Sequence, residues 1–328
     1  MKNRLIAVLT ATVLVAPLSA PFSAFAQAFP SKPVRIIVPW PPGAIDVSVR
    51  LMQNAMSEDL GQPVIVETRP GASGFIGAEQ VARSTPDGYT LLATAAGSLV
   101  TGTIINPKAP FDTLRDFAPV TLIYDSAQVI VAKMSLPQTN LKELLDFAKA
   151  NPGKLSYGST GIGAAQHVDG ETFKRTAGVD IVHIPYGGFG PLMQAVAGQQ
   201  VDLAFATVGI VRQLVLGQKA RLIAVHGGKA PANYPAAANL NDVFPGFVTA
   251  PGFIGLWVPA ATPRPIVNRL NTAAVRALRT PEVRAKFDET GVNVVANSPD
   301  EFAAVVKSSF DSAGRSIREA QAAGVKFE

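Results

Sequence analysis

The feature that most constrains the fold is an alternation of short apolar strands with amphipathic helices, which occurs twice. The first run predicts strands at residues 34–38, 63–67 and 86–94 and helices at 46–60 and 75–84. The second run predicts helices at 140–154, 163–177, 190–199 and 211–218, with strands at 155–160, 180–186, 201–207 and 221–225. Such alternation is typical of a mostly parallel sheet covered by helices on both faces. The restart therefore predicts two α/β lobes.

Two long apolar stretches, Ala118–Lys133 and Gly252–Ala260, stand between and after the two runs. We interpret them as crossover strands that join the lobes, so lobe one would comprise residues 27–122 and 252–328 and lobe two residues 123–251. Two crossovers predict a hinge, and a hinge between two α/β lobes predicts a ligand cleft. Terminal helices are expected to begin after Thr280 and Ser298, each with proline at its first position.

The first 26 residues have the pattern of a secretory signal peptide. Lys2 and Arg4 precede an apolar run at residues 5–16, and Ala24-Phe25-Ala26 is a small-x-small cleavage site. An N-terminal membrane anchor is the alternative, but the run is short for a span of roughly 20 residues. We therefore expect export to the periplasm and cleavage after Ala26.

Composition excludes several classes of protein. Hydrophobic residues make up 48% and charged residues 16% of the chain, which indicates a globular protein. The chain has no cysteine, so disulfides and thiolate chemistry are excluded. Removing residues 1–26 takes away two basic residues and lowers the formal net charge from +5 to +3. This mild charge, without a basic cluster, argues against nucleic acid as a partner.

The loops that follow the predicted strands are rich in small residues and poor in charge. In open parallel sheets ligands lie beyond the carboxyl ends of the strands, where helix N-termini offer backbone N–H groups and partial positive charge. Such loops suit an anion, for example a carboxylate, although glycine in a strand–helix turn also serves tight geometry. The candidate ligand-binding residues are Trp40, Pro41, Pro42, Gly43, Ala44, Asp46, Gly97, Ser98, Ser159, Thr160, Gly161, Gly163, Ala164, Ala165, His167, Tyr186 and Thr207.

Four side chains in and near these loops have competing interpretations. Trp40 offers a face to a planar acid or packs between the lobes, and the sequence favours neither. Asp46 is most simply a helix cap, since a carboxylate would repel an anionic ligand. His167 lies near the predicted cleft, but a structural histidine is the more common case, and His183 within an apolar strand is expected to be structural.

No catalytic or metal-binding pattern is present. Ser73 lacks the spacing of a G-x-S-x-G elbow, there is no Walker A loop, and residues 158–163 do not match G-x-G-x-x-G in order. The three histidines, His167, His183 and His226, show no metal-ligand spacing. We therefore expect no enzyme activity, no cofactor and no metal.

Several motifs resemble a known family. The stretches "VRIIVPWPPG", "RPGASGFIGA" with "PDGYTLL", "LSYGSTGIGAAQH", and "HIPYGG" with "GQQVDLAF" resemble the Bug family, the TctC-like substrate-binding proteins of tripartite tricarboxylate transporters. The resemblance covers essentially the whole mature chain. It implies a type II periplasmic binding fold with Venus-flytrap closure on a small organic acid. It also implies that Pro39–Asp46 and Ser159–His167 grip the ligand carboxylate through main-chain N–H groups and ordered water.

The chain departs from the family pattern in both loops. "VPWPPGAID" is one residue shorter than usual and has Ile45 where threonine is common, and residues 163–165 lack the usual hydroxyls. Gly187 replaces a common lysine and Ala206 a common aspartate. These changes predict a less polar pocket that favours an aromatic or apolar carboxylate over an amino acid.

Three functions remain open on this basis. The first is a monomeric binding protein that delivers an organic acid to membrane transporter subunits. The second is a periplasmic sensor that presents the bound acid to a membrane signalling receptor. The third is an enzyme on the same scaffold, which the missing catalytic patterns argue against. The signal peptide and the lack of a DNA-binding segment argue against the effector half of a cytoplasmic transcription factor.

Overall fold

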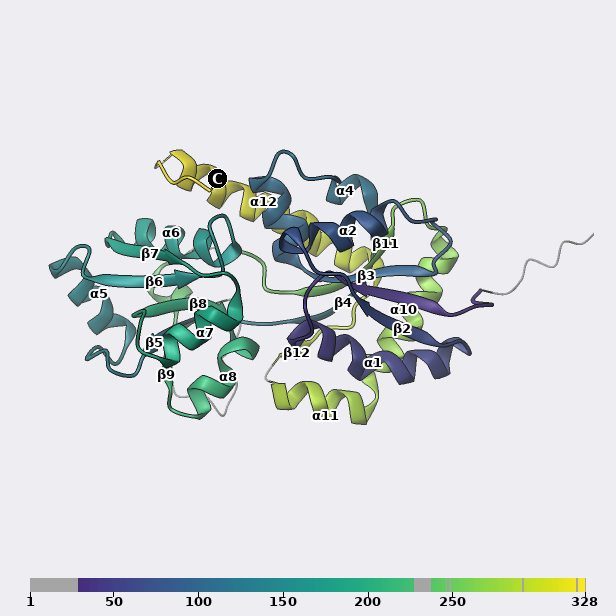
Figure 1. Cartoon of the computed structure of the whole chain (residues 1–328), viewed down its shortest axis with the longest axis horizontal. Helices are drawn as coiled ribbons and strands as arrows, with labels where there is room; N and C mark the ends of the chain where they lie inside the picture. Colours follow the sequence, from purple (N-terminus) through teal and green to yellow (C-terminus); the bar gives the residue numbers. More distant parts are fainter. Residues whose placement is uncertain are drawn as a thin grey trace, which may run out of the picture.

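The computed structural model describes residues 29–226, 237–245, 247, 249–290, 292–322 and 324–327, without the side chains of Ala44 and Thr290. Figure 1 shows two lobes side by side, each built on one sheet. The predicted signal peptide lies outside the described residues. No helix within these ranges is long and apolar enough to cross a bilayer.

Sheet one has the strand order β12-β4-β11-β3-β1-β2. Its strands are β1 (Val34–Val38), β2 (Val64–Thr68), β3 (Thr90–Ala95), β4 (Phe117–Asp125), β11 (Ile254–Pro259) and β12 (Asn293–Val294). β1 runs parallel to β2 and β3, whereas β11 runs antiparallel to β3 and β4. Sheet one is therefore mixed: β1 to β4 run in one direction, whereas β11 and β12, on the returning chain, run in the opposite direction.

Helices cover both faces of sheet one. They are α1 (Ala44–Leu60), η1 (Ala72–Gly74), α2 (Phe75–Ala82), η2 (Gly97–Thr101), α3 (Gly102–Ile105), α4 (Thr113–Asp116), α10 (Arg264–Arg279), α11 (Pro281–Thr290) and α12 (Pro299–Ala322). Ile36 packs in one core with Met52 and Leu270, while its neighbour Ile37 packs in the other with Leu99 and Phe302. Successive residues of a strand point to opposite faces, so a sheet covered on both sides needs a continuous apolar run.

Sheet two has the order β10-β9-β5-β8-β6-β7. Its strands are β5 (Gln128–Lys133), β6 (Leu155–Ser159), β7 (Ile181–Pro185), β8 (Leu203–Thr207), β9 (Ala220–His226) and β10 (Ala238–Asn239). Its helices are α5 (Leu141–Ala150), α6 (Ala165–Ala177), α7 (Phe189–Ala197), α8 (Val208–Leu216) and α9 (Leu240–Val243). As in sheet one, the crossover strand β5 is antiparallel to both of its neighbours.

The two crossings between the sheets touch each other. Ser126 and Ala127 separate β4 from β5, so the first predicted crossover is two strands in two sheets. The second crossing precedes β11, which pairs only within sheet one. The Nε2 of Gln128 donates to the carbonyl of Ala250 at 3.1 Å. A Cβ on Gly252 would lie 2.5 Å from the carbonyl oxygen of Ser126. The predicted lobe boundaries, between residues 122 and 123 and between residues 251 and 252, stay a proposal.

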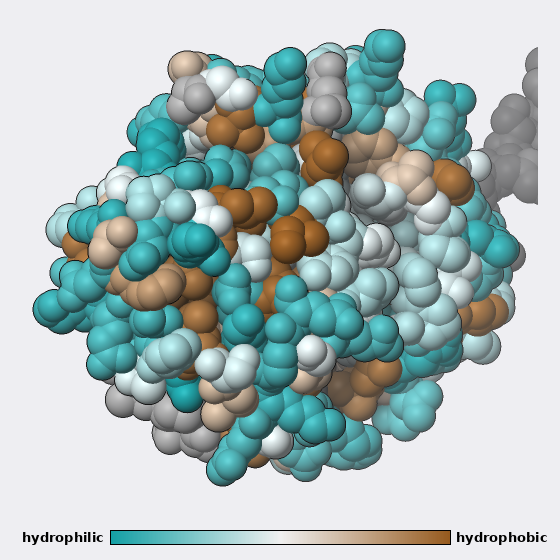
Figure 2. All heavy atoms as spheres, turned by 60° about the vertical axis from the view of Figure 1, so that its left-hand side comes forward, coloured by the Kyte–Doolittle hydropathy of each residue, from teal (hydrophilic) through white to brown (hydrophobic). Residues whose placement is uncertain are grey.

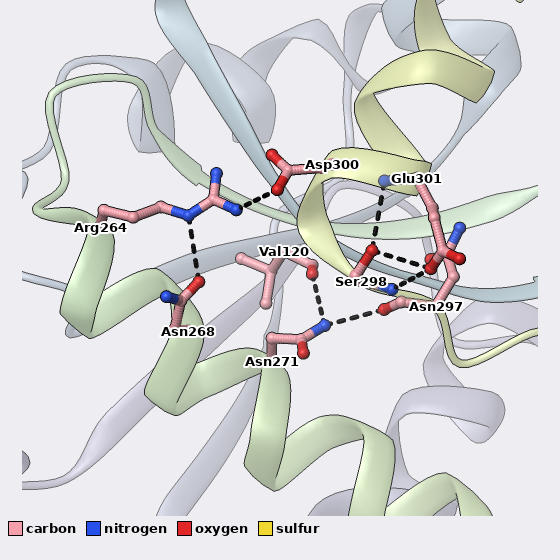
Figure 3. A network of polar contacts seen from close by, with 8 residues as sticks. All are labelled: Val120, Arg264, Asn268, Asn271, Asn297, Ser298, Asp300 and Glu301. Atoms are coloured by element: carbon pink, nitrogen blue, oxygen red, sulfur yellow. Dashed lines mark hydrogen bonds and ion pairs between the residues drawn. The ribbon is translucent and has the colours of Figure 1, made fainter.

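Helix α12 also connects the lobes. The predicted capping box is present at its start: Ser298 N–H donates to the Glu301 carboxylate at 2.8 Å, and Glu301 N–H donates to Ser298 Oγ at 3.3 Å (Figure 3). Asn271 fixes the same turn through the carbonyl of Asn297 at 2.8 Å. The helix has 24 residues and is therefore about 36 Å long. Near its far end Glu319 forms an ion pair with Arg175 of α6 at 2.7 Å, so α12 reaches from lobe one onto lobe two (Figure 1).

Candidate functional site

The lobe-one ligand loop, Pro39–Asp46, connects the carboxyl end of β1 to α1. Pro41, Pro42 and Gly43 are exposed, while the side chain of Ala44 lies outside the described residues. Gly43 is the N-cap of α1 with a φ of 173°, and no side chain caps this end of the helix. Because prolines lack an N–H, the donors at this helix start come from Gly43 onward.

Asp46 forms an ion pair and does not cap the helix, so the expected capping role is wrong. The helix begins two residues before Asp46, which is too early for the carboxylate to occupy the N-cap. Asp46 is buried, and Arg50 donates to it from Nε at 3.0 Å. The same guanidinium donates to the carbonyl of Val66 at 3.3 Å. The negative charge of Asp46 is therefore satisfied on the side of β2.

Trp40 is held inside lobe one. Its indole N–H donates to Thr94 Oγ1 at 3.2 Å, and its ring packs beside Gly74, where an added Cβ would lie 3.4 Å from Cζ2. The side chain is partly buried against the core of lobe one. The orientation of the indole ring is therefore set before any ligand arrives.

A strained turn, Gly71–Gly74, lies next to Trp40 and was not among the predicted site residues. All four residues have positive φ, including Ala72 at 46° and Ser73 at 54°. Non-glycine residues in this region cost free energy and often occur at functional sites. Ser98 Oγ donates to the carbonyl of Ser73 at 2.9 Å, so the hydroxyl of Ser98 holds this turn. The glycines of "RPGASG" were the only signal for the turn in the sequence.

The lobe-two ligand loop, Ser159–His167, uses its own hydroxyls internally. Ser159 is fully buried, and its Oγ accepts from Gly161 N–H at 3.1 Å and lies 2.7 Å from His183 Nε2. Thr160 Oγ1 donates to Gln166 Oε1 at 2.8 Å. The hydroxyls of these two candidate residues therefore shape the loop.

His167 supports the same loop from behind. Its Nδ1 accepts the N–H of Gly163 at 3.1 Å, which places the ring proton on Nε2. The ring stacks on His183 with centroids 3.9 Å apart and planes 9° apart, and His183 stacks on Tyr157 at 4.9 Å. Burial lowers the pKa of His167 and, together with the neighbouring His167, lowers the pKa of His183 to about 4. The neutral form is therefore favoured in both rings.

The remaining predicted residues surround these loops. Ala164 precedes α6 without a capping side chain, and Ala165 is the first residue of the helix. A Cβ on Gly97 would lie 3.9 Å from the Cβ of Ala165, so the two lobes meet here. Tyr186 lies over Gly158, and Thr207 precedes α8 without a side-chain capping bond.

A cavity of about 420 Å³ lies beside the lobe-two loop. Its lining combines lobe two with the end of the chain: Ile162, His167, Glu171, His183, Gly324, Val325 and Lys326. It shares Ile162 and His167 with the lobe-two loop and is lined by none of the candidate ligand-binding residues of lobe one. Figure 2 shows hydrophobic residues gathered across the middle of one face of the molecule, with hydrophilic residues on both sides.

Within the described ranges, no three His, Cys, Asp or Glu side chains form a metal-binding group.

The two loops share one chemical property. Each presents a helix N-terminus without a capping side chain, at α1 and at α6. Orphan N–H groups and the helix dipole at such ends stabilise an anion. The only acidic side chain of the two loops, Asp46, is already paired with Arg50. The arrangement can therefore bind a carboxylate mainly through the backbone.

This fold is that of the two-lobed periplasmic solute-binding proteins. The family described as "Tripartite tricarboxylate transporter family receptor" matches residues 48–321, and the chain belongs to this family. The protein BugT of Bordetella pertussis is 32% identical over 302 residues, which are 91% of this chain and 92% of BugT.

Two solved structures with bound acids are also similar. An R. palustris protein with adipate has a TM-score of 0.81 and 27% identity, covering 89% of this chain and 98% of that one. MatC from Rhodopseudomonas palustris with bound malate has a TM-score of 0.77 and 27% identity, covering 88% and 100%. The resemblance to the Bug family is thereby confirmed.

Proposed function

We propose that this chain captures a small organic carboxylate between its lobes and delivers it to the membrane subunits of a tripartite tricarboxylate transporter. The observation that carries the proposal is the pair of uncapped helix N-termini at α1 and α6, one in each lobe. Adipate and malate in two similar proteins support a carboxylate as the ligand. In this proposal the protein is a monomer without catalytic activity.

The free side-chain donors in the loops are few, which favours an apolar acid. Three hydroxyls donate to oxygen atoms of the protein itself, those of Ser98, Ser159 and Thr160. Ile45, where the family commonly has threonine, has no side-chain donor, and it packs against the core of lobe one. Backbone N–H groups would then bind the carboxylate, and Trp40 would contact the apolar part of the ligand.

Isothermal titration calorimetry tests the ligand class. We expect adipate, benzoate and phthalate to bind more tightly than aspartate, glutamate and citrate. Each side-chain donor missing from the pocket weakens a charged ligand by about 1.5–3 kcal/mol, and apolar contact offsets this only for the first group. Tight binding of aspartate or glutamate would contradict the proposal.

Two variants separate the contributions of the lobe-one loop. Gly43→Pro removes an N–H at the start of α1 and forces φ away from 173°, so it should weaken every carboxylate, whereas the control Gly43→Ala keeps both the N–H and the extended backbone. Trp40→Ala should weaken only the apolar acids, and Trp40→Phe, which keeps a ring without the bond to Thr94, should weaken them less. If Trp40→Ala and the wild type bind the apolar acids with equal affinity, Trp40 does not contact the ligand.

Export and delivery are tested in cells. We propose that residues 1–26 are removed on export, so the mature protein should begin at Gln27. Cross-linking of the exported protein in the presence of adipate should capture transporter subunits. Capture of a signalling receptor would instead support the sensor.

A further inference from the structure

The end of the chain folds back onto lobe two. After α12, Gly324 adopts a φ of 88°. Its N–H donates to the carbonyl of Gln321 at 2.9 Å, and Val325 N–H donates to that of Ala320 at 3.0 Å. This pair of bonds is a Schellman motif, in which glycine takes the left-handed position and the chain reverses. The reversal directs the last residues back toward α6.

The reversed segment buries one large side chain where the lobes meet. Phe327 is only 6% exposed and packs with Ile317 and Ala320 of α12, with Ile105 of lobe one and with Val168 of lobe two. Its ring meets that of His167 edge to face, with centroids 5.1 Å apart and planes 71° apart. Such edge-to-face contacts add stabilisation beyond buried area.

The main chain of Phe327 also contacts the lobe-two loop. A Cβ on Gly163 would lie 2.8 Å from the carbonyl oxygen of Phe327 and 3.3 Å from Cγ2 of Ile105. Gly163 is the residue whose N–H is bound by His167. Phe327 therefore contacts both partners of the hydrogen bond that shapes the loop, from the segment that follows α12, a helix that begins in lobe one.

We propose that Phe327 is a positioning residue for ligand binding: it holds the ring of His167 and the backbone of Gly163 in place, and so keeps the N-terminus of α6 ready for a carboxylate. The proposal rests on the function proposed above. A loop already held in its bound conformation loses less conformational freedom on binding, so affinity rises. Without Phe327, His167 and Gly163 would lose the contact behind them, and the loop would sample other conformations.

Three variants test this role. Phe327→Ala removes the ring, Phe327→Leu keeps a large apolar side chain, and Phe310→Ala is a matched control on α12, before the reversed segment. Phe310 is partly buried against the core of lobe one, away from the lobe-two loop. In hydrogen exchange, the Gly163 amide should exchange roughly tenfold faster in Phe327→Ala, which is a loss of about 1.4 kcal/mol. Exchange should stay near the wild-type rate in the other two variants.

Calorimetry with adipate as the probe gives the second readout. Phe327→Ala should raise the Kd roughly tenfold, while Phe327→Leu restores most of the affinity and Phe310→Ala leaves it unchanged even where it lowers the Tm. Unchanged exchange of Gly163 in Phe327→Ala, or equal effects from Phe310→Ala, would overturn the proposal. If the wild type does not bind adipate, the proposed function fails on that probe, and the exchange of Gly163 alone decides the role of Phe327.

Discussion

The two ligand loops both lead to a helix N-terminus without a capping side chain, but different interactions determine their conformations. The lobe-one loop is shaped by covalent geometry: Pro39, Pro41 and Pro42 restrict φ, and Gly43 has an extended backbone that any residue adopts. The lobe-two loop contains no proline. It is shaped by side-chain bonds within the loop and by the packing of His167 and Phe327 behind it.

This difference implies different sensitivity to change. A loop fixed mainly by its own covalent structure depends on few distant residues, which here are Thr94 and Gly74 beside Trp40. A loop fixed by packing depends on every contact behind it, including those from the other lobe. The lobe-two loop should therefore be the one through which distant substitutions alter ligand binding.

The largest expected contrast is between Gly163→Ala and Gly43→Ala. Gly163 has a φ of 74° and no room for a Cβ beside Phe327, whereas a Cβ on Gly43 would meet its nearest atom at 3.7 Å. We expect Gly163→Ala to lower the free energy of unfolding by about 2 kcal/mol and Gly43→Ala to change it by less than about 0.5 kcal/mol. Urea unfolding measures both, and equal costs would remove the distinction between the loops.

A second contrast concerns two buried acidic residues, Asp46 on α1 and Asp169 on α6. Asp46 is paired with Arg50, but Asp169 is buried with one oxygen accepting from Ala250 N–H at 2.5 Å and the other without a partner among the described residues. Burial raises the pKa of Asp169 to about 8. The folded protein thus holds this proton more tightly than the unfolded chain, so the contribution of Asp169 to stability is lost as the pH rises from about 4 through 8.

Asp169→Asn should remove this dependence. Asparagine keeps an acceptor for Ala250 N–H and has no proton to lose. We expect the stability of the variant relative to the wild type to rise by about 1–2 kcal/mol between pH 5 and pH 9. Urea unfolding at several pH values measures this difference. A difference that is constant over this range would show that Asp169 is ionised in the folded protein.

A smaller effect is expected on the acid side, from the rings behind the lobe-two loop. The pKa of His183 is lowered to about 4, so the unfolded chain binds this proton more readily. Stability is fully present above the unfolded pKa of about 6.5 and is lost as the pH falls toward 4. His183→Gln should reduce this loss by about 0.5–1 kcal/mol, since the ring is only partly buried. If the wild type and His183→Gln lose the same free energy of unfolding between pH 6.5 and pH 4, the pKa of His183 is not lowered in the folded protein.

The smallest effect is expected at the lobe-one loop. Arg50→Gln removes the ion pair with Asp46, in which the Arg50 side chain is 48% exposed. Asp46 is buried, but it lies in the first turn of α1, where the helix dipole stabilises its charge without Arg50. The exposed Arg50 therefore contributes only what a pair at this helical spacing does, about 0.3–0.5 kcal/mol, and salt screens it. We expect that loss at low salt, little loss in 1 M NaCl, and a weaker affinity for adipate, because the unpaired carboxylate of Asp46 repels the ligand. A loss above about 1 kcal/mol would show that this loop also depends on side-chain packing.

The lobes were predictable because their strands and helices carry local signals. Continuous apolar runs such as Val34–Val38 and capping signals such as Ser298 with Glu301 act within a few residues. The short elements β10, α9 and β12 were not predicted, because they form only where another segment pairs or packs with them. The break at Ser126 and Ala127 was hidden inside one apolar stretch for the same reason.

The site was less predictable than the fold. Sequence position indicated the loops, since strand ends and small residues mark them. It could not show that Ser98, Ser159 and Thr160 bond within the protein, because the partners Ser73 and Gln166 are chosen by tertiary structure or loop geometry. It gave no signal at all for Phe327, which lies more than 150 residues from His167 in the chain. Whether the predicted loops contact a ligand remains a prediction.

The place of β11 in sheet one has a consequence for biogenesis. β11 lies between β3 and β4, yet it is synthesised after all of lobe two. A chain that has emerged only as far as residue 250 has two separate pieces of sheet one, with the edges of β3 and β4 unpaired. Unpaired edges are prone to aggregation. Lobe two can finish folding from one continuous segment, whereas lobe one must wait for the last quarter of the chain, so its unfinished half is the part most in need of a chaperone.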